Sequence, residues 1–238
     1  GQPKRGFSLD KPKDLSDEIG LVAGYNMTLD EDGTVSDLSG NGNDGTNTGC
    51  LPSNDGLVFD GSASYVDLGT TFLQGSNDGS IEVRFKLNQL PSVAGASMAI
   101  IDGRDANDDG IRIACDSADD TLLISINEAD YYPATVLSIN VWYNLVFSID
   151  WSGDKIVYLN GVSVHSSDTI PSGAIATTTD WKTGRVAFSG TWYFNGNVDD
   201  IRIYNKALTA QEAIDYHNSF ILPTLVETFD EGADGIAK

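Results

Sequence analysis

The sequence predicts an all-β fold: a two-sheet antiparallel sandwich of the jelly-roll type with one short C-terminal helix. Short segments rich in β-branched and aromatic residues recur along most of the chain, and turns of Gly, Asn and Asp separate them. Many short strands with such turns are typical of sandwiches and jelly rolls. Apolar residues at helical spacing occur only near the C-terminus. The 238 residues suit one large sandwich with a sizeable core.

The expected strands begin with residues 21–25 and end with residues 198–204. Between them we expect strands at 56–59, 65–68, 80–87, 98–102, 110–115, 121–127, 141–150, 155–159, 162–165 and 185–189. Asn160 and Gly161 separate two of these segments and suit the positive φ angles of a type I′ turn. A tight hairpin is therefore expected at this point.

The expected helix begins after Thr209. Thr209 and Glu212 have the spacing of a capping box, in which the hydroxyl caps the first turn and the glutamate reaches back to the cap amide. Ala213, Tyr216 and Phe220 then recur at helical spacing. One face of this helix is therefore expected to dock on the sandwich.

The chain divides into a central domain and two polar ends. We expect an N-terminal arm or linker at residues 1–19, the sandwich domain at 20–220 and a C-terminal extension at 221–238. Both ends lack the apolar content to fold alone, so we expect them to contact other protein chains of an assembly. Because the chain begins at Gly1 instead of Met, we also expect it to have been trimmed from a longer product.

The chain is strongly acidic. It carries 35 Asp and Glu against 14 Lys and Arg, which gives a formal net charge of −21. This charge repels nucleic acids and anionic membranes, and it excludes both as direct partners. No apolar run approaches the length of a transmembrane helix, so no membrane insertion is expected. The charge attracts cations such as Ca²⁺, although adaptation to salty or crowded surroundings would explain it equally well.

The chain has two cysteines, Cys50 and Cys115. Both have small or apolar neighbours, so two buried free thiols are expected. A disulfide remains the alternative, because the sequence cannot show whether the two side chains meet.

Three motifs carry a resemblance to a known family. They are Asp37-Leu-Ser-Gly-Asn-Gly-Asn-Asp-Gly-Thr46, Gly56-Leu-Val-Phe-Asp-Gly61 and Gly196-Asn-Val-Asp-Asp-Ile-Arg-Ile-Tyr-Asn-Lys-Ala-Leu208. In this order and at these separations they resemble laminin-G-like domains of the concanavalin A-like lectin/glucanase superfamily, over roughly residues 20–220. The resemblance implies the jelly-roll fold and a habit of glycan binding, while the function of one member depends on its own site.

The sequence predicts that the protein is not an enzyme. Glucanases of this superfamily place carboxylates at alternating positions of one strand, as E-x-D-x-(x)-E, and no such triplet occurs here. The two histidines, His165 and His217, have no Ser or Cys nucleophile motif beside them. Glu82 and Arg84 share one face of an expected strand, where we expect a solvated pair that points outward.

The resemblance implies a structural Ca²⁺ near the first motif. Its ligands would come from Asp37, Asn41 and Asn43 of the loop and from Asp199 or Asp200 of the closing strand. Asp and Asn oxygens on a Gly-rich loop suit this hard cation. Adjacent strand residues face opposite sides, so only one aspartate of the pair can contribute. The alternative is an Asx-rich turn held by side-chain-to-backbone hydrogen bonds.

Several aromatic residues are candidates for a sugar platform, because pyranose faces stack on exposed rings. Those in or beside expected loops are Tyr131, Tyr132, Trp151, Trp181, Trp192 and Tyr193. The alternative is that these rings cap the ends of the core and keep their polar tips in water. Trp142 lies inside an apolar segment and is expected in the core.

Two functions remain in view. The sequence favours a non-catalytic structural component of a larger assembly, such as a viral decoration or fibre protein, in which the terminal arms make the contacts. The alternative is a carbohydrate-binding or adhesion module of a larger extracellular protein, with glycans as partners. Either function places the protein outside the cell, on a cell surface or in a virion.

Overall fold

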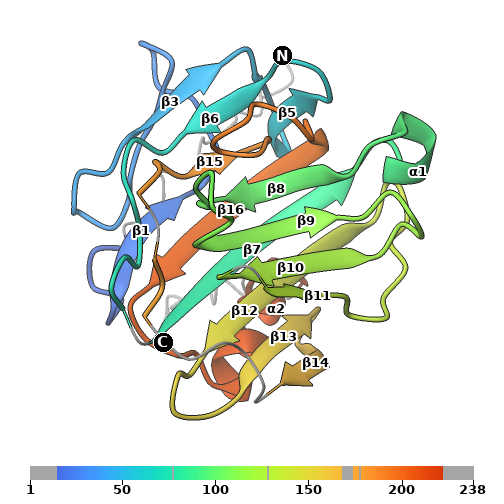
Figure 1. Ribbon diagram of the computed structural model, residues 1–238. Coiled ribbons are helices and arrows are strands. Elements are labelled where there is room, and N and C mark those ends of the chain that lie inside the picture. The colour runs from blue at the N-terminus through green and yellow to red at the C-terminus, as the bar shows by residue number, and fades with distance from the viewer. Residues whose placement is uncertain (1–14, 77, 128, 168–173, 177, 222–238) are drawn as a thin grey trace, which may run out of the picture.

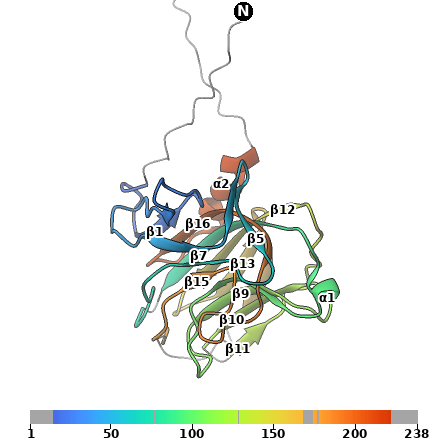
Figure 2. The same cartoon turned by 90° about the horizontal axis from the view of Figure 1, so that it is seen from above.

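The computed structural model describes residues 15–76, 78–127, 129–167, 174–176 and 178–221. In these residues two antiparallel sheets stack face to face (Figure 1). A C-terminal helix, α2 (Ala210–Ile221), lies on the outer side of one of them (Figure 2). The predicted antiparallel sandwich with one short C-terminal helix is confirmed.

Sheet A runs in the order β14, β13, β12, β7, β16, β5 and β4, and β1 pairs with β16 beside this path. Its strands are β1 (Leu21–Tyr25), β4 (Leu51–Ser53), β5 (Gly56–Asp60), β7 (Gly79–Leu87), β12 (Trp142–Ile149), β13 (Lys155–Leu159), β14 (Val162–Ser167) and β16 (Asn195–Tyr204). The predicted hairpin joins β13 to β14, and Asn160 and Gly161 have φ angles of 53° and 76°. Both angles suit a type I′ turn.

Sheet B runs in the order β11, β10, β9, β8, β15, β6, β3 and β2. Its strands are β2 (Thr34–Val35), β3 (Gly45–Thr48), β6 (Tyr65–Asp67), β8 (Met98–Asp102), β9 (Ile111–Cys115), β10 (Leu122–Ile126), β11 (Ala129–Tyr131) and β15 (Lys182–Thr183). A single helical turn, α1 (Pro91–Ala94), stands between β7 and β8 in the chain.

The core lies between the sheets, where alternate residues of each strand point inward. Ile81, Val83 and Phe85 of β7 have no exposed surface, and they belong to the same buried cluster as Ile113 and Ile124 of sheet B. Each side chain of this kind stabilises the fold by roughly 1.5–3 kcal/mol when fully buried. The residues between them point outward, so the outer faces carry the polar side chains.

The capping box of α2 forms as predicted. The Glu212 backbone N–H donates to the Thr209 hydroxyl at 3.2 Å, and the Thr209 N–H donates to the Glu212 carboxylate at 2.7 Å. Ala213 and Tyr216 of the helix are buried against the outer face of sheet A. The layers are therefore α2, sheet A and sheet B, as Figure 2 shows.

Residues 185–189 were expected to form a strand, and this prediction is wrong. They form turns between Gly184 and Gly190, whose φ angles of 95° and 61° interrupt extended backbone. The strands β2, β3, β4, β11 and β15 were not predicted, because their short, mostly polar sequences show no alternation of apolar residues. The chain thus has a longer irregular segment before β16 and a more structured one before β5.

Residues 15 and 18, which lie in the expected N-terminal arm, contact the sandwich. Leu15 is only 2% exposed, and the Glu18 carboxylate lies 3.2 Å from the Arg202 guanidinium of β16. The rest of the expected arms, residues 1–14 and 222–238, lies outside the described residues. Cys50 and Cys115 are free and buried, as predicted. No helix in the described ranges is long and apolar enough to cross a membrane.

Candidate functional site

A row of polar residues crosses the outer face of sheet B. Asp102 of β8 pairs in register with Arg112 of β9, Arg112 with Ser125 of β10, and Ser125 with Asp130 of β11. Inward-facing neighbours such as Ile113 belong to the core, so alternation turns the polar residues outward. We call Asp102, Arg112, Ser125 and Asp130 the polar row. The Arg112 guanidinium donates to the Ser125 hydroxyl at 3.1 Å.

Asp102 anchors the row and is fully buried. Burial raises the pKa of this carboxyl to about 6, although the backbone N–H of Arg104 and the guanidinium groups of Arg104 and Arg112 act in the opposite direction. Its Oδ1 accepts the Arg104 N–H at 2.9 Å, and its Oδ2 lies 3.7 Å and 4.0 Å from the Nε atoms of the two arginines. Burial and the nearby Arg104 lower the pKa of Arg112. The two guanidinium groups are thus held close together over one carboxylate.

The loop between β15 and β16 lies over this row. The Ala99 N–H donates to the Trp192 carbonyl at 2.8 Å, which ties the loop to β8. The centre of the Trp192 ring lies 4.3 Å from the guanidinium carbon of Arg112, a cation–π contact. Trp192 has a φ of 54°, a left-handed conformation that bulky residues rarely adopt. Such strain costs ~1–3 kcal/mol and clusters at functional sites.

An open pocket of about 300 Å³, the Trp192 pocket, lies between the loop and the polar row. Its lining combines charged groups, rings and hydroxyls: Arg104, Asp108, Arg112, Asp130, Phe188, Trp192, Ser189 and Thr191. The side chains of Asp108 and Asp130 are 55% and 40% exposed, while those of both arginines are nearly buried. The nearly buried arginines can donate hydrogen bonds to a ligand in this pocket, and the exposed carboxylates of Asp108 and Asp130 can accept hydrogen bonds from the same ligand.

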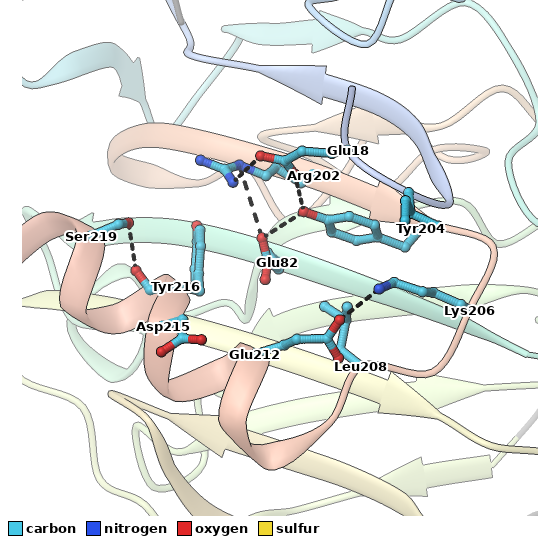
Figure 3. A pocket seen from close by; sticks show the side chains of 11 residues that line it. Glu18, Glu82, Arg202, Tyr204, Lys206, Leu208, Glu212, Asp215, Tyr216 and Ser219 are labelled. Atoms are coloured by element: carbon cyan, nitrogen blue, oxygen red, sulfur yellow. Dashed lines mark hydrogen bonds and ion pairs between the residues drawn. The ribbon is translucent and has the colours of Figure 1, made fainter. Parts of the chain in front are cut away.

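A second polar cluster lies on the outer face of sheet A, under α2 (Figure 3). Burial raises the pKa of Glu82 to about 8, against the opposing charge of Arg202. The Tyr204 hydroxyl donates to Glu18 at 2.7 Å and lies 3.3 Å from the Glu82 carboxyl. Arg202 donates to Asp200 at 3.0 Å. We call these five residues the Glu82 cluster.

A cavity of about 380 Å³ adjoins the Glu82 cluster. Figure 3 shows the Glu82 carboxyl between the strand residues and the helix residues Glu212, Asp215 and Tyr216. Glu82 is 3% exposed, so the prediction of a solvated pair with Arg84 is wrong. Both side chains do point outward, but α2 covers Glu82, and Phe220 of α2 lies over Arg84 at 4.4 Å.

The profile of the concanavalin A-like lectin/glucanases superfamily matches residues 60–213 of the chain. The chain belongs to this superfamily. No curated protein matches the sequence.

The solved structures similar to this superfamily member include binding domains of larger proteins. Domain 4 of AbnA, a GH43 extracellular arabinanase from Geobacillus stearothermophilus solved in complex with arabinotriose, matches with a TM-score of 0.63 and 24% identity. That match covers 83% of this chain and 98% of the domain. The binding domain of Paraclostridial Mosquitocidal Protein 1 matches with a TM-score of 0.69 and 17% identity, over 87% of this chain and 53% of the other.

A third match is a structure of botulinum neurotoxin type C, whose cell entry depends on interaction with two ganglioside molecules. It has a TM-score of 0.64 and 16% identity, over 86% of this chain and 52% of the toxin chain. The chain therefore spans about half of the two toxin structures. At these identities the likeness shows the shared fold alone.

Trp181, one of the aromatic residues predicted to form a sugar platform, lies in the core instead of on the surface. Trp181 has no exposed surface and packs edge-on against Phe72, with ring centroids 5.6 Å apart. A Cβ on Gly103 would lie 2.1 Å from its indole ring, so the ring fills space that only a glycine leaves open. Trp142 was expected in the core, and this prediction is wrong. It is partly exposed on sheet A, where the Arg84 guanidinium lies 4.5 Å from its ring centre.

The other candidate rings fall in different places. Trp192 lines the pocket, and Tyr193 follows it in the same loop with partial exposure. Tyr132 is 52% exposed, and partial burial together with the nearby Asp130 raises its pKa. Tyr131 lies 5.7 Å from the His165 ring, and Trp151 packs partly against the core near Lys155. The structure thus brings Trp192 into the pocket and Tyr132 close to the row.

The loop with the predicted calcium ligands has its own hydrogen bonds. Asp37 Oδ1 accepts the Gly24 and Ser39 N–H groups at 2.9 Å and 3.0 Å, and Oδ2 accepts the Ser39 hydroxyl and the Asn43 N–H at 2.8 Å and 3.0 Å. Asn41 and Asn43 donate to the Val22 carbonyl. The Asx-rich turn accounts for these contacts, and it leaves Asp37 no vacant lone pair for Ca²⁺.

The closing-strand aspartates are also engaged. Asp199 lies 2.9 Å from the Arg84 Nε, and Asp200 lies 3.0 Å from the Arg202 Nε. Among the described residues, no group of three or more His, Cys, Asp or Glu side chains could hold a metal ion. The arrangement does not fit the predicted calcium site, and the effect of Ca²⁺ on the thermal midpoint tests that prediction.

The charged residues of the Trp192 pocket were not predicted as site residues. A signal was present, because Arg112 stands between Ile111 and Ile113, and Ser125 stands between Ile124 and Ile126. Polar residues that alternate with isoleucine in adjacent strands predict a polar row on one face. The missing information was the pairing of the strands, which places these residues side by side.

Proposed function

We propose that this chain is a non-catalytic carbohydrate-binding module of a larger extracellular protein, and that the Trp192 pocket binds the glycan. The observation that carries the proposal is the pocket's combination of groups on an open sheet face. Buried arginines supply donors, exposed aspartates supply acceptors, and Trp192 and Phe188 supply apolar ring surface. Carbohydrate sites combine rings with a few well-placed polar groups in this way.

The rigidity of the pocket supports the proposal. Arg112 lies under the Trp192 ring and donates to Ser125, so its guanidinium is fixed before a ligand arrives. Trp192 is itself held by the hydrogen bond from Ala99. Fixed side chains lose little conformational entropy on binding, which improves affinity at a given contact area.

The similar structures support the same function. Domain 4 of AbnA was solved with arabinotriose, and botulinum neurotoxin type C interacts with gangliosides. AbnA is an extracellular enzyme, which agrees with an extracellular place for this chain. The assembly hypothesis depended on the terminal arms, and most of their residues lie outside the described ranges. The carbohydrate-binding alternative has the better support because the similar structures include proteins that bind glycans.

A matched pair of aspartates allows a sharp test. The side chains of Asp108 and Asp55 are each 55% exposed, and each is paired with a cation: Asp108 with Arg104 at 3.3 Å in the pocket, and Asp55 with Lys86 at 3.0 Å on sheet A. After a glycan array has identified a ligand, calorimetry should show that Asp108→Ala weakens binding about tenfold, since a charge-assisted hydrogen bond is lost. Asp55→Ala should bind as the wild type does.

Trp192→Ala should weaken the same ligand further, because stacking on the ring is lost. Trp151→Ala serves as the aromatic control, since Trp151 is partly exposed in another part of the sandwich. Equal losses in the Asp108 and Asp55 variants, or a loss in the Trp151 variant alone, would place the binding site elsewhere.

A further inference from the structure

We infer that the Trp192 pocket selects neutral sugars with two adjacent free hydroxyl groups and rejects sugars that carry a carboxylate. This inference rests on the proposed function and names its ligand class. It depends on the charges inside the pocket and on which of them a ligand meets first.

The positive charge of the pocket is already matched. Two guanidinium groups, those of Arg104 and Arg112, face three carboxylates, those of Asp102, Asp108 and Asp130. Asp102 lies fully buried beneath the arginines and balances part of their charge. With three carboxylates against two guanidinium groups, the pocket has no excess positive charge to attract a carboxylate ligand.

The rim of the pocket is acidic. A ligand that enters meets the half-exposed carboxylates of Asp108 and Asp130 before it reaches the nearly buried arginines. A carboxylate placed about 4 Å from one of them is repelled by ~1 kcal/mol in water and by more where solvent is excluded. The net charge of −21 adds a repulsion that acts on any anion during approach.

Neighbouring hydroxyl groups fit the same arrangement. The Asp108 carboxylate lies 3.3 Å from the Arg104 guanidinium, so an acceptor and a donor stand side by side at the pocket wall. One sugar hydroxyl can donate to the carboxylate while the adjacent hydroxyl accepts from the guanidinium. Asp130 and Arg112, 3.8 Å apart, offer a second pair of this kind. Ring carbons of the sugar can then face Phe188, which is 44% exposed, and Trp192.

The test compares matched ligands on the whole chain. A glycan array should carry neutral trisaccharides, arabinotriose among them, together with C6-oxidised forms of the hexose trisaccharides and the methyl esters of those oxidised forms. We expect a neutral trisaccharide to bind, its C6-oxidised form to bind about tenfold more weakly or worse, and the methyl ester to recover most of the loss. Higher salt should narrow the gap, because it screens the repulsion.

The double variant Asp108→Asn, Asp130→Asn gives the second arm. It keeps a carbonyl acceptor at both positions and removes two negative charges, so the C6-oxidised ligand should gain affinity relative to the neutral one. Asp55→Asn on sheet A is the control and should leave the ratio unchanged. If the oxidised form binds the wild type as tightly as the neutral form, the inference is wrong while the proposed function stands. If no glycan on the array binds, the proposed function fails and the inference fails with it.

Discussion

The two outer faces of the sandwich carry similar polar clusters under different covers. On sheet A the carboxyl of Glu82 lies near Arg202, and on sheet B the carboxylate of Asp102 lies near Arg112. Burial raises the pKa of both carboxyls. A docked helix covers the first cluster and leaves a cavity of about 380 Å³ beside it, whereas a loop covers the second in part and leaves the Trp192 pocket of about 300 Å³.

The two clusters differ in the element that covers them and in the residues which that element adds. Under α2 the buried groups pair with one another, through Glu18, Tyr204 and Asp200, and the Arg202 guanidinium lies 5.5 Å from the ring centre of Tyr216 in the helix. Under the loop the charged groups reach an opening with a ring beside it. We propose that the Glu82 cluster is a structural element that responds to pH and that the polar row is the base of a binding site.

The largest expected effect concerns the pH response of the Glu82 cluster. The pKa of Glu82 is raised from 4.5 to about 8 in the folded protein. The unfolded chain thus loses this proton at lower pH than the folded chain does. The stabilising contribution is fully present below about pH 4.5 and is lost as the pH rises to about 8. One pKa unit corresponds to ~1.4 kcal/mol, so the loss is on the order of a few kcal/mol.

Glu82→Gln removes the ionisable group and keeps its shape. Urea unfolding between pH 4.5 and 8.5 should show a flatter dependence of the unfolding free energy for this variant than for the wild type. Glu31→Gln, at an exposed position, is the control and should follow the wild-type curve. Parallel curves for the wild type and Glu82→Gln would mean that Glu82 ionises in the folded protein as it does in the unfolded chain. That result would contradict the raised pKa of this carboxyl.

An intermediate effect concerns the Asp37 loop, a third polar region, where the sequence resemblance implies a structural Ca²⁺. Asp37→Ala removes the acceptor of four hydrogen bonds and should destabilise the fold by roughly 1–3 kcal/mol. Because the Asx-rich turn accounts for these contacts, thermal midpoints of the wild type should agree in Ca²⁺ and in chelator. A higher midpoint in Ca²⁺ that disappears in Asp37→Ala would restore the calcium hypothesis.

Local features of the fold could be predicted from the sequence, because their causes lie within a few residues. The Asn160-Gly161 turn and the capping box of Thr209 and Glu212 depend on local backbone chemistry, and both were confirmed. Alternation predicted the outward direction of Glu82 and Arg84 in β7, whereas Trp142, expected in the core, is partly exposed. Local residues also explain the error at 185–189, since Gly184 and Gly190 could have been read as breaks.

The site could be predicted only in part, because its cause is long-range. Alternation gives Glu82 and Arg112 the same outward direction, and it says nothing of what lies above them. Trp181 and Trp192 both stand near loops, yet one fills a space over Gly103 and the other lines the pocket. Trp181 precedes β15, and its carbonyl accepts the Leu68 N–H at 2.8 Å. Trp192 lies in the loop between β15 and β16, and its carbonyl accepts the Ala99 N–H of β8 at 2.8 Å.

The most direct test of the central claim follows the four tryptophans. Each indole N–H gives a separate signal in a proton–nitrogen NMR spectrum, and the variants Trp142→Phe, Trp151→Phe and Trp192→Phe assign three of them. On titration with a glycan that binds on the array, we predict a large shift of the Trp192 signal. Trp142, on the opposite sheet, and the buried Trp181 should stay in place. A shift of the Trp142 or Trp151 signal with Trp192 unchanged would contradict the claim that the glycan binds on the polar row of sheet B.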